Sequence, residues 1–204
     1  MQYRVSYRGS DGFRLGPIGF LILINLILLI VTLIVPRLKF DLGLAPFMVT
    51  SRPWTIITNM FIHDGIWHFF TNMLTLFFFG NYLMRYTGKT GFFVTYFLAG
   101  LMGNLFYLGY AQISEATMYS VAIGASGAVF GVAGALTVLK PKMTVFIIPI
   151  PVPIPLWIAI LGGFLLLSVP GFAGNIAWQA HLGGLVLGLI VGLYYRKKPR
   201  IYLG

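Results

Sequence analysis

The stretch "AIGASGAVFGVAGALTVL", residues 122–139, places a single serine in an otherwise small and apolar segment. Ser126 has Gly124 two residues before it and Gly127 directly after it. Glycines around a side chain allow another backbone to come very close. A serine at a helix start also lies beside backbone N–H groups that have no partner within the helix. The stretch therefore predicts a membrane helix with a close neighbour and one hydroxyl near its beginning.

The composition of the whole chain fits this interpretation. Of 204 residues, 58% are hydrophobic and only 9% are charged, whereas soluble domains carry about 25% charged residues. Such a chain cannot cover a water-facing surface, so we predict an integral membrane protein. The net charge of +10 is attributed to topology-setting loops rather than to nucleic acid. Cysteine is absent, which excludes disulfides and cysteine nucleophiles.

Six apolar segments are candidates for membrane spans, each near the roughly 20 residues that a span requires. The sequence predicts an all-α membrane protein, a bundle of six transmembrane helices, with spans near residues 17–35, 67–86, 91–111, 121–139, 152–169 and 175–195.

The basic residues indicate the orientation of these spans. Most of the 14 Lys and Arg residues fall before the first span, after the last, or in the loops that share that side. Cytoplasmic loops carry such an excess, so both termini are expected in the cytoplasm of a multi-pass cell-membrane protein. We expect a basic N-terminal segment (residues 1–16), one six-helix domain (17–195) and a basic tail (196–204).

Polar side chains recur near the outer ends of the second, fourth and sixth predicted spans. They are His68, Asn72, Ser126 and His181. Ionisable groups inside spans are rare and usually face the bundle interior or a water-filled cavity. These four residues are therefore expected to form one shallow polar layer, although they are far apart in the sequence.

Ser126 and His181 suggest a nucleophile and its base. Gly184, Gly188 and Gly192 follow His181 at intervals of four residues, and Gly-rich helices can approach closely. A serine becomes an effective nucleophile when a base within about 2.6–3.2 Å takes its proton. The four acidic residues all lie outside the predicted spans, so a Ser–His dyad is favoured over a triad.

The other candidate residues each allow two interpretations. Asn72 and His68 lie four residues apart on one helix face, and both can donate hydrogen bonds to an oxyanion or form an interhelical clasp. Phe130 lies one turn after Ser126 and either packs against the His181 ring or belongs to the ordinary core. Zinc is the rival chemistry, but the sequence contains no His-Glu-x-x-His pattern, so no metal and no cofactor are expected.

Three motifs together resemble the rhomboid family of intramembrane serine proteases. They are "HDGIWHFFTNM" (residues 63–73), "GASG" (124–127) and "AHLGG" (180–184), in that order along the chain. The resemblance implies that Ser126 is the nucleophile and His181 the base. It also implies an oxyanion hole lined by His68, Asn72 and the Ser126 N–H, with Gly124 shaping the adjacent loop. Many relatives carry tyrosine where Phe130 stands.

The resemblance further implies a substrate class. A membrane helix hides its peptide bonds, so a cleaved segment has to unwind near the outer face. We expect single-span transmembrane proteins as substrates within the lipid bilayer, and no nucleic-acid partner. A catalytically inactive rhomboid-like binding protein is the alternative. A transporter is less well supported because the chain shows no internal repeat and its polar layer is off-centre.

Overall fold

The computed structural model describes residues 16–147, 150–168 and 177–197. The expected segments 1–16 and 196–204 lie almost entirely outside these ranges, as does the beginning of the sixth predicted span. The described elements are α1 (Pro17–Ile34), α2 (Leu38–Leu42), η1 (Pro46–Met48), α3 (Thr55–Thr58), η2 (Asn59–Phe61), α4 (Ile66–Thr75), η3 (Leu76–Gly80), α5 (Asn81–Ala111), α6 (Glu115–Met118), α7 (Ser126–Leu139), β1 (Thr144–Ile147), β2 (Ile150–Pro155), α8 (Leu156–Ser168) and α9 (Trp178–Lys197).

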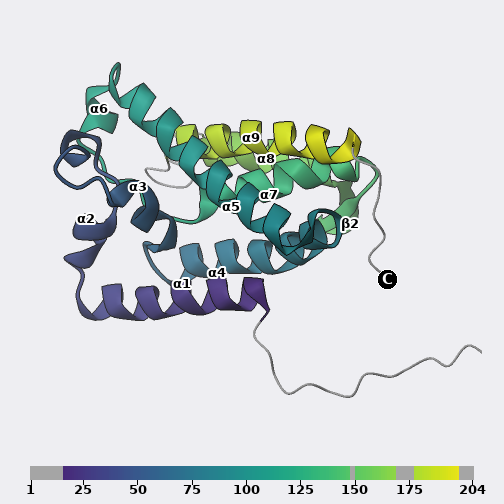
Figure 1. Ribbon diagram of the computed structural model, residues 1–204, viewed down its shortest axis with the longest axis horizontal. Coiled ribbons are helices and arrows are strands. Elements are labelled where there is room, and N and C mark those ends of the chain that lie inside the picture. The colour runs from purple at the N-terminus through teal and green to yellow at the C-terminus, as the bar shows by residue number, and fades with distance from the viewer. Residues whose placement is uncertain (1–15, 148–149, 169–176, 198–204) are drawn as a thin grey trace, which may run out of the picture.

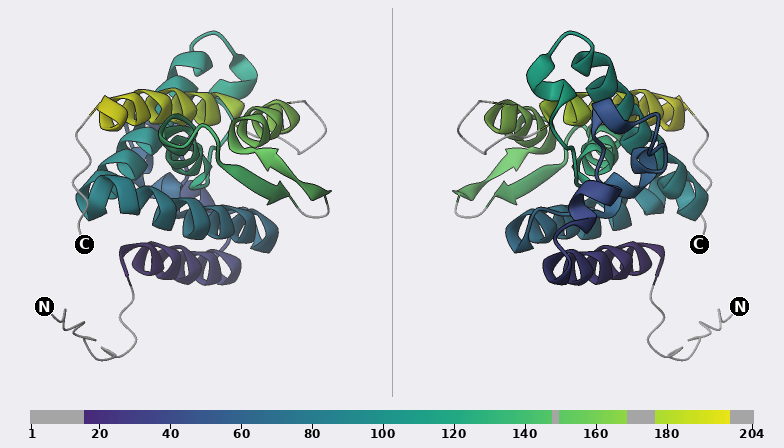
Figure 2. Two further views of the ribbon diagram at one scale, coloured as in Figure 1. Left: turned by 90° about the vertical axis from the view of Figure 1, so that its right-hand side faces the viewer. Right: turned by 90° about the vertical axis from the view of Figure 1, so that its left-hand side faces the viewer.

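The long helices run roughly along one axis, and the short helices α2, α3 and α6 gather at one end, the α6 end (Figure 1). Helix α7 lies at the centre of the bundle, packed against α5 and α9 and in contact with α4 and α8 (Figure 2). Most of its residues are buried, and nearly all of its residues are apolar or glycine. A helix that is apolar all round suits such a central place.

The described residues contain three helices that are long and apolar enough to cross a membrane. These are Pro17–Ile34, Ile66–Ala111 and Trp178–Lys197. The second is continuous through η3, but Gly88 has a non-helical backbone with a φ of 71°, and the chain turns back there (Figure 1). It therefore contains the second and third predicted spans. The count of six spans stays a prediction.

The fourth span begins later than the sequence pattern predicts. Residues 121–125 lie outside the helix, with Ala122 in an isolated β-bridge to Leu44, and α7 has only 14 residues. At 1.5 Å per residue it is about 21 Å long, shorter than the roughly 30 Å hydrocarbon core. Ser126 is consequently the first residue of its helix, and the loop before it takes up part of the expected span. Non-helical backbone at such a depth is tolerated where protein encloses it.

The fifth and sixth spans also differ from their predicted bounds. A proline-rich strand, β2, pairs antiparallel with β1 where the fifth span was expected to begin, and helix α8 starts only at Leu156. Proline suits an edge strand because it donates no ladder hydrogen bond. Helix α9 begins at Trp178, so His181 lies one turn into it rather than two.

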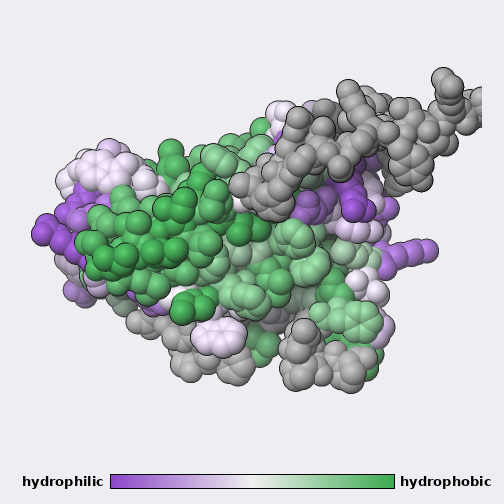
Figure 3. Space-filling view, turned by 90° about the horizontal axis from the view of Figure 1, so that it is seen from below, coloured by the Kyte–Doolittle hydropathy of each residue, from purple (hydrophilic) through white to green (hydrophobic). Residues whose placement is uncertain are grey.

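The outer surface of the bundle is apolar along its length. Figure 3 shows a broad hydrophobic band with hydrophilic residues toward both ends. On α1, exposed side chains such as Phe20, Ile27 and Ile34 contribute to this surface. An apolar patch of this extent on a soluble monomer would be exceptional. The band therefore fits a lipid-facing surface between two water-facing ends.

Candidate active site

Ser126 is placed by a short loop that other segments hold firmly. Ala122 exchanges two backbone hydrogen bonds of 2.9 Å with Leu44, and the Gly124 N–H donates to the Asn59 carbonyl over 2.9 Å. Gly124 has a φ of 128°, a region that favours glycine. The chain can therefore turn sharply from this loop into α7, and Ser126 begins the helix. The first N–H groups of α7, that of Ser126 included, have no acceptor within the helix.

His181 reaches Ser126 from the facing helix α9. Its Nε2 atom lies 2.7 Å from the Ser126 Oγ, within hydrogen-bonding distance. The His181 side chain is buried, whereas Ser126 is partly exposed. The structure thus brings together the two side chains that the sequence proposed as nucleophile and base. The separation is that required of a base that takes the proton from a serine hydroxyl.

Glycines allow the two helices to come this close. A Cβ atom added to Gly188 of α9 would lie 2.7 Å from the Gly131 Cα of α7, and one added to Gly134 would lie 3.0 Å from the Leu185 carbonyl oxygen. On another side of α9, a Cβ on Gly183 would lie 2.6 Å from the Met102 carbonyl oxygen of α5. Any larger residue would push these backbones apart.

Phe130 is in contact with the imidazole ring of His181. The two rings are stacked, with centroids 4.7 Å apart and an angle of 23° between their planes. Phe164 of α8 packs edge-on against Phe130, with ring centroids 6.3 Å apart. The Nδ1 atom of His181 has no hydrogen-bond partner among the described residues. The ring is therefore oriented by stacking and by Ser126, and none of the described ion pairs involves it.

His68 lies in α4, close to the Gly124 loop. The backbone N–H of Asp64 donates to its Nδ1 over 3.3 Å, so in the neutral ring the proton is on Nε2. A Cβ atom added to Gly124 would lie 2.8 Å from His68 Nε2 and 3.5 Å from Ser126 Oγ. The Nε2–H group can thus donate toward the space beside Ser126. The sequence did not predict the hydrogen bond from the Asp64 N–H to His68, because this bond depends on the turn before α4.

Asn72 stands one turn further along α4. Its Nδ2 atom donates to the His68 carbonyl oxygen over 2.8 Å, and its side chain is buried. This bond uses one of its two N–H groups. The other is available to a ligand. Asn72 is thereby linked to His68 within the same helix.

A pair of asparagines that the sequence did not single out braces the loop. Asn59 and Asn104 exchange two side-chain hydrogen bonds of 2.9 Å, and both are buried. The Asn59 carbonyl accepts the Gly124 N–H described above. The sequence offered a signal only for Asn104, a polar residue within the apolar helix α5, where such residues usually serve a functional site or an interhelical contact.

Gly124 provides a direct test of this geometry. We expect Gly124→Ala to lower kcat about 5- to 150-fold, because a strained backbone costs about 1–3 kcal/mol and the new methyl group would displace His68. Cleavage kinetics on a model transmembrane substrate measure the effect. Gly88→Ala is the matched control, since Gly88 also has a positive φ but no atom within 4 Å of its added Cβ. It should lower stability and leave kcat unchanged; an unchanged kcat in Gly124→Ala would contradict the geometry.

His63 makes stability depend on pH. Its ring is buried before α4 and packs edge-on against His68 with centroids 5.1 Å apart. Burial lowers the pKa of His63 to about 3, and the neighbouring His68 adds to this effect. The unfolded chain therefore binds a proton that the folded chain does not between pH 6.5 and pH 3.

We accordingly expect stability to fall as pH decreases through this window, with a contribution from His63 of about 1.4 kcal/mol per pH unit. His63→Phe keeps an aromatic ring in place but cannot be protonated. Thermal unfolding in detergent at several pH values should show a flatter pH dependence for this variant. Parallel profiles for the two proteins would show that His63 titrates in the folded protein as it does in the unfolded chain, which would contradict the prediction.

Within the described residues, no group of three His, Asp or Glu side chains could hold a metal ion. The site instead presents the Ser126 hydroxyl, the buried His181 imidazole and the first backbone N–H groups of α7, which have no acceptor within the helix. This combination places the protein in the class of membrane proteins with a serine–histidine pair, the arrangement of a serine nucleophile and its base.

Comparison with known proteins identifies the family. The family model described as "Rhomboid domain" matches residues 50–198, and the chain belongs to the rhomboid family. "Rhomboid protein 1, mitochondrial" of Saccharomyces cerevisiae is 35% identical over 154 residues, which cover 73% of this chain and 43% of that protein. "Putative rhomboid protease YdcA" of Bacillus subtilis is 30% identical over 164 residues, covering 80% of this chain and 76% of that protein.

One relative carries a different name. "Inactive RHOMBOID-like protein 8" of Arabidopsis thaliana is 30% identical over 149 residues, covering 72% of this chain and 40% of that protein. The chain spans less than half the length of the yeast relative and of this one. Family membership thus supports an intramembrane protease at the level of the family, and establishes a membrane protein.

Proposed function

We propose that this protein is an intramembrane serine endopeptidase that uses Ser126 and His181 as a catalytic dyad. The observation that carries the proposal is the 2.7 Å separation of Ser126 Oγ and His181 Nε2 in a rhomboid-family fold. Its substrates are single-span membrane proteins, cut in or near their transmembrane segments. The protease domain comprises residues 17–195 and forms six spans, with both termini in the cytoplasm of a cell membrane.

The first half of the reaction forms an acyl-enzyme. His181 Nε2 takes the Ser126 hydroxyl proton as Oγ attacks the scissile carbonyl carbon. The carbonyl oxygen becomes an oxyanion, which the Ser126 N–H and His68 Nε2–H stabilise, with Asn72 as a further donor and Gly124 shaping the loop. The C–N bond then breaks, and the protonated His181 gives its proton to the leaving amine.

The second half uses water. A water molecule enters from the α6 end, which in the proposed orientation faces the outside of the cell. His181 takes its proton while the oxygen attacks the ester carbonyl, and the proton returns to Ser126 as the carboxylic acid product leaves. Phe130 holds the imidazole plane during both halves. No cofactor is needed for these steps.

A serine-reactive fluorophosphonate probe tests the proposal on the full chain in detergent or lipid. We expect labelling of the wild-type protein and its loss in Ser126→Ala, together with loss of cleavage of a model transmembrane substrate. Peptide mapping should place the adduct on Ser126. Equal cleavage by Ser126→Ala would remove this serine from the mechanism. Absence of both labelling and cleavage in the wild-type protein would favour the alternative, an inactive rhomboid-like protein that binds membrane helices.

A further inference from the structure

The short helix α2, in the loop after the first predicted span, is held by side chains of the segment that contains α3. Three of them donate to its last carbonyl groups over 2.7–3.2 Å: Arg52 to Phe40, Trp54 to Asp41 and Thr58 to Leu42. Arg52 also forms an ion pair of 2.9 Å with the Asp41 carboxylate. The last carbonyls of a helix have no donors within it, so these side chains satisfy them. Helix α2 is therefore anchored at the α6 end, although it has only five residues (Figure 1).

Lys39 extends from this anchored helix to the turn before α4. Its Nζ atom donates to the Asp64 Oδ1 over 2.9 Å. The Lys39 side chain is 26% exposed, whereas that of Asp64 is 71% exposed. A surface ion pair usually contributes little, because two mobile side chains must be ordered to form it. Here the backbone of Lys39 is already fixed together with α2, so part of that ordering cost is removed.

Asp64 is also the residue whose backbone orients His68. Its N–H donates to the His68 Nδ1 over 3.3 Å, which is long for a hydrogen bond and therefore sensitive to small movements of the turn. Gly65 follows Asp64 with a φ of 134°, and a Cβ atom added to it would meet no heavy atom within 4 Å. Packing around Gly65 thus does not fix the turn, and the ion pair with Lys39 supplies a contact to another element.

We propose that Lys39 and Asp64 position His68 as a donor to the oxyanion. The ion pair holds the turn, the Asp64 N–H holds the ring with its proton on Nε2, and this proton is the one that serves the site. Lys39 and Asp64 do not touch the reacting atoms, so they are positioning residues. The inference rests on the proposed endopeptidase function, and it makes the loop after the first span a support of the active site.

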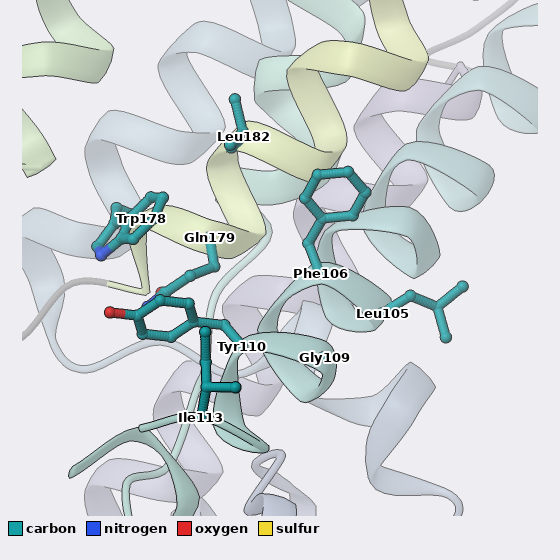
Figure 4. A pocket seen from close by; sticks show the side chains of 8 residues that line it. All are labelled: Leu105, Phe106, Gly109, Tyr110, Ile113, Trp178, Gln179 and Leu182. Carbon is teal, nitrogen blue, oxygen red and sulfur yellow. The ribbon is translucent and has the colours of Figure 1, made fainter. Parts of the chain in front are cut away.

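Three single variants separate the ion pair from general effects of charge. Lys39→Met keeps the apolar stem and removes the ammonium group, and Asp64→Asn keeps the shape and the backbone N–H. Arg37→Met is the matched control, because it removes the same charge two residues earlier, where the exposed Arg37 pairs with Asp41 at 3.6 Å. None of these positions lines the apolar groove between α5 and α9 that Figure 4 shows, so the variants leave that groove unchanged.

The first measurement is single-turnover cleavage of a model transmembrane substrate over a range of substrate concentrations. We expect Lys39→Met and Asp64→Asn to lower the saturating rate about two- to fivefold, the range that an exposed ion pair can supply. The half-saturating substrate concentration and the unfolding temperature should stay near the wild-type values, and Arg37→Met should change none of the three.

Non-additivity tests whether the ion pair acts through His68. The double variant Lys39→Met/Asp64→Asn should be no slower than either single variant, because each removes the same contact. In a His68→Gln background, Lys39→Met should have no further effect, since the group that it positions is gone. An unchanged rate in Lys39→Met, or an equal further loss in the His68→Gln background, would overturn the proposal.

The second measurement needs no substrate. The chain has only three histidines, so ¹⁵N NMR of the full chain with labelled histidine can resolve each ring, and His68→Gln identifies the His68 signals by their loss. At about pH 8, where histidine side chains are mostly neutral, we expect the Nε2–H tautomer of His68 in the wild-type protein and in Arg37→Met. Lys39→Met should show a mixture of both tautomers.

A wild-type tautomer in Lys39→Met would contradict the positioning role whatever the cleavage rates. The expected change of tautomer in a protein that cleaves nothing would support the positioning of His68 and contradict the protease activity alone. The two proposals can therefore fail separately.

Discussion

Replacement of His181 by alanine is expected to abolish measurable proteolysis, with kcat lowered at least about ten-thousand-fold, as seen when one member of a catalytic serine–histidine unit is removed. Without the imidazole, the Ser126 hydroxyl has no base among the described side chains within hydrogen-bonding distance. The measurement is single-turnover cleavage of a fluorescent transmembrane substrate in liposomes. Single-turnover conditions separate the chemical step from substrate entry and product release.

His181→Phe is the companion variant, because it removes the base and keeps an aromatic ring against Phe130. The His181 ring is stacked at 4.7 Å in the native protein, so a phenyl ring can occupy the same space. We expect His181→Phe to unfold at nearly the wild-type temperature and to be as inactive as His181→Ala. Cleavage by a correctly folded His181→Phe at more than a trace of the wild-type rate would exclude His181 as the base.

The second large effect is expected at the contact between α7 and α9. Gly188→Leu should destabilise the fold by about 3 kcal/mol, the upper part of the range for overpacking. The added side chain would meet the Gly131 backbone, which cannot rotate away as a flexible side chain can. Since the same contact holds Ser126 beside His181, cleavage should be lost together with stability. Thermal unfolding and cleavage of the same sample measure both.

Gly162→Leu serves as the control, since its added side chain meets no atom within 4 Å. It introduces the same hydrophobic group into a lipid-facing helix. Its unfolding temperature and cleavage rate should stay near those of the wild-type protein. If Gly188→Leu were equally harmless, the helices would be held together by something other than glycine contacts, and the explanation of the short distance between Oγ and Nε2 would be wrong.

Glycine spacing predicted the contact between helices, but not the bounds of the helices. The four-residue repeat after His181 identifies a flat helix face whatever surrounds it, and only a second glycine-rich helix can use such a face. The start of α7 could not be predicted in this way. Residues 121–125 are as apolar as a helix interior, but they lie outside the helix. Ala122 and Gly124 are held there by hydrogen bonds to Leu44 and Asn59, which lie far away in the sequence.

The supporting contacts of the site show the same limit. His68 was identified from its four-residue spacing to Asn72, which is a property of one helix. Its ring tautomer depends on the Asp64 N–H in the preceding turn, whose direction no periodicity indicates. The hairpin of β1 and β2 was likewise not predicted, because residues 152–169 were expected to form the fifth span.

The shortness of α7 has a consequence for where substrates are cut. Ser126 is the first residue of α7, a central helix that is shorter than its neighbours α5 and α9. The length of α7 fixes the depth of the serine in the bundle. The scissile bond must therefore be delivered to a set depth. A substrate helix lengthened by inserted residues on its outer side should be cut at a new bond, at the same distance from the membrane surface, rather than at the original amino-acid pair.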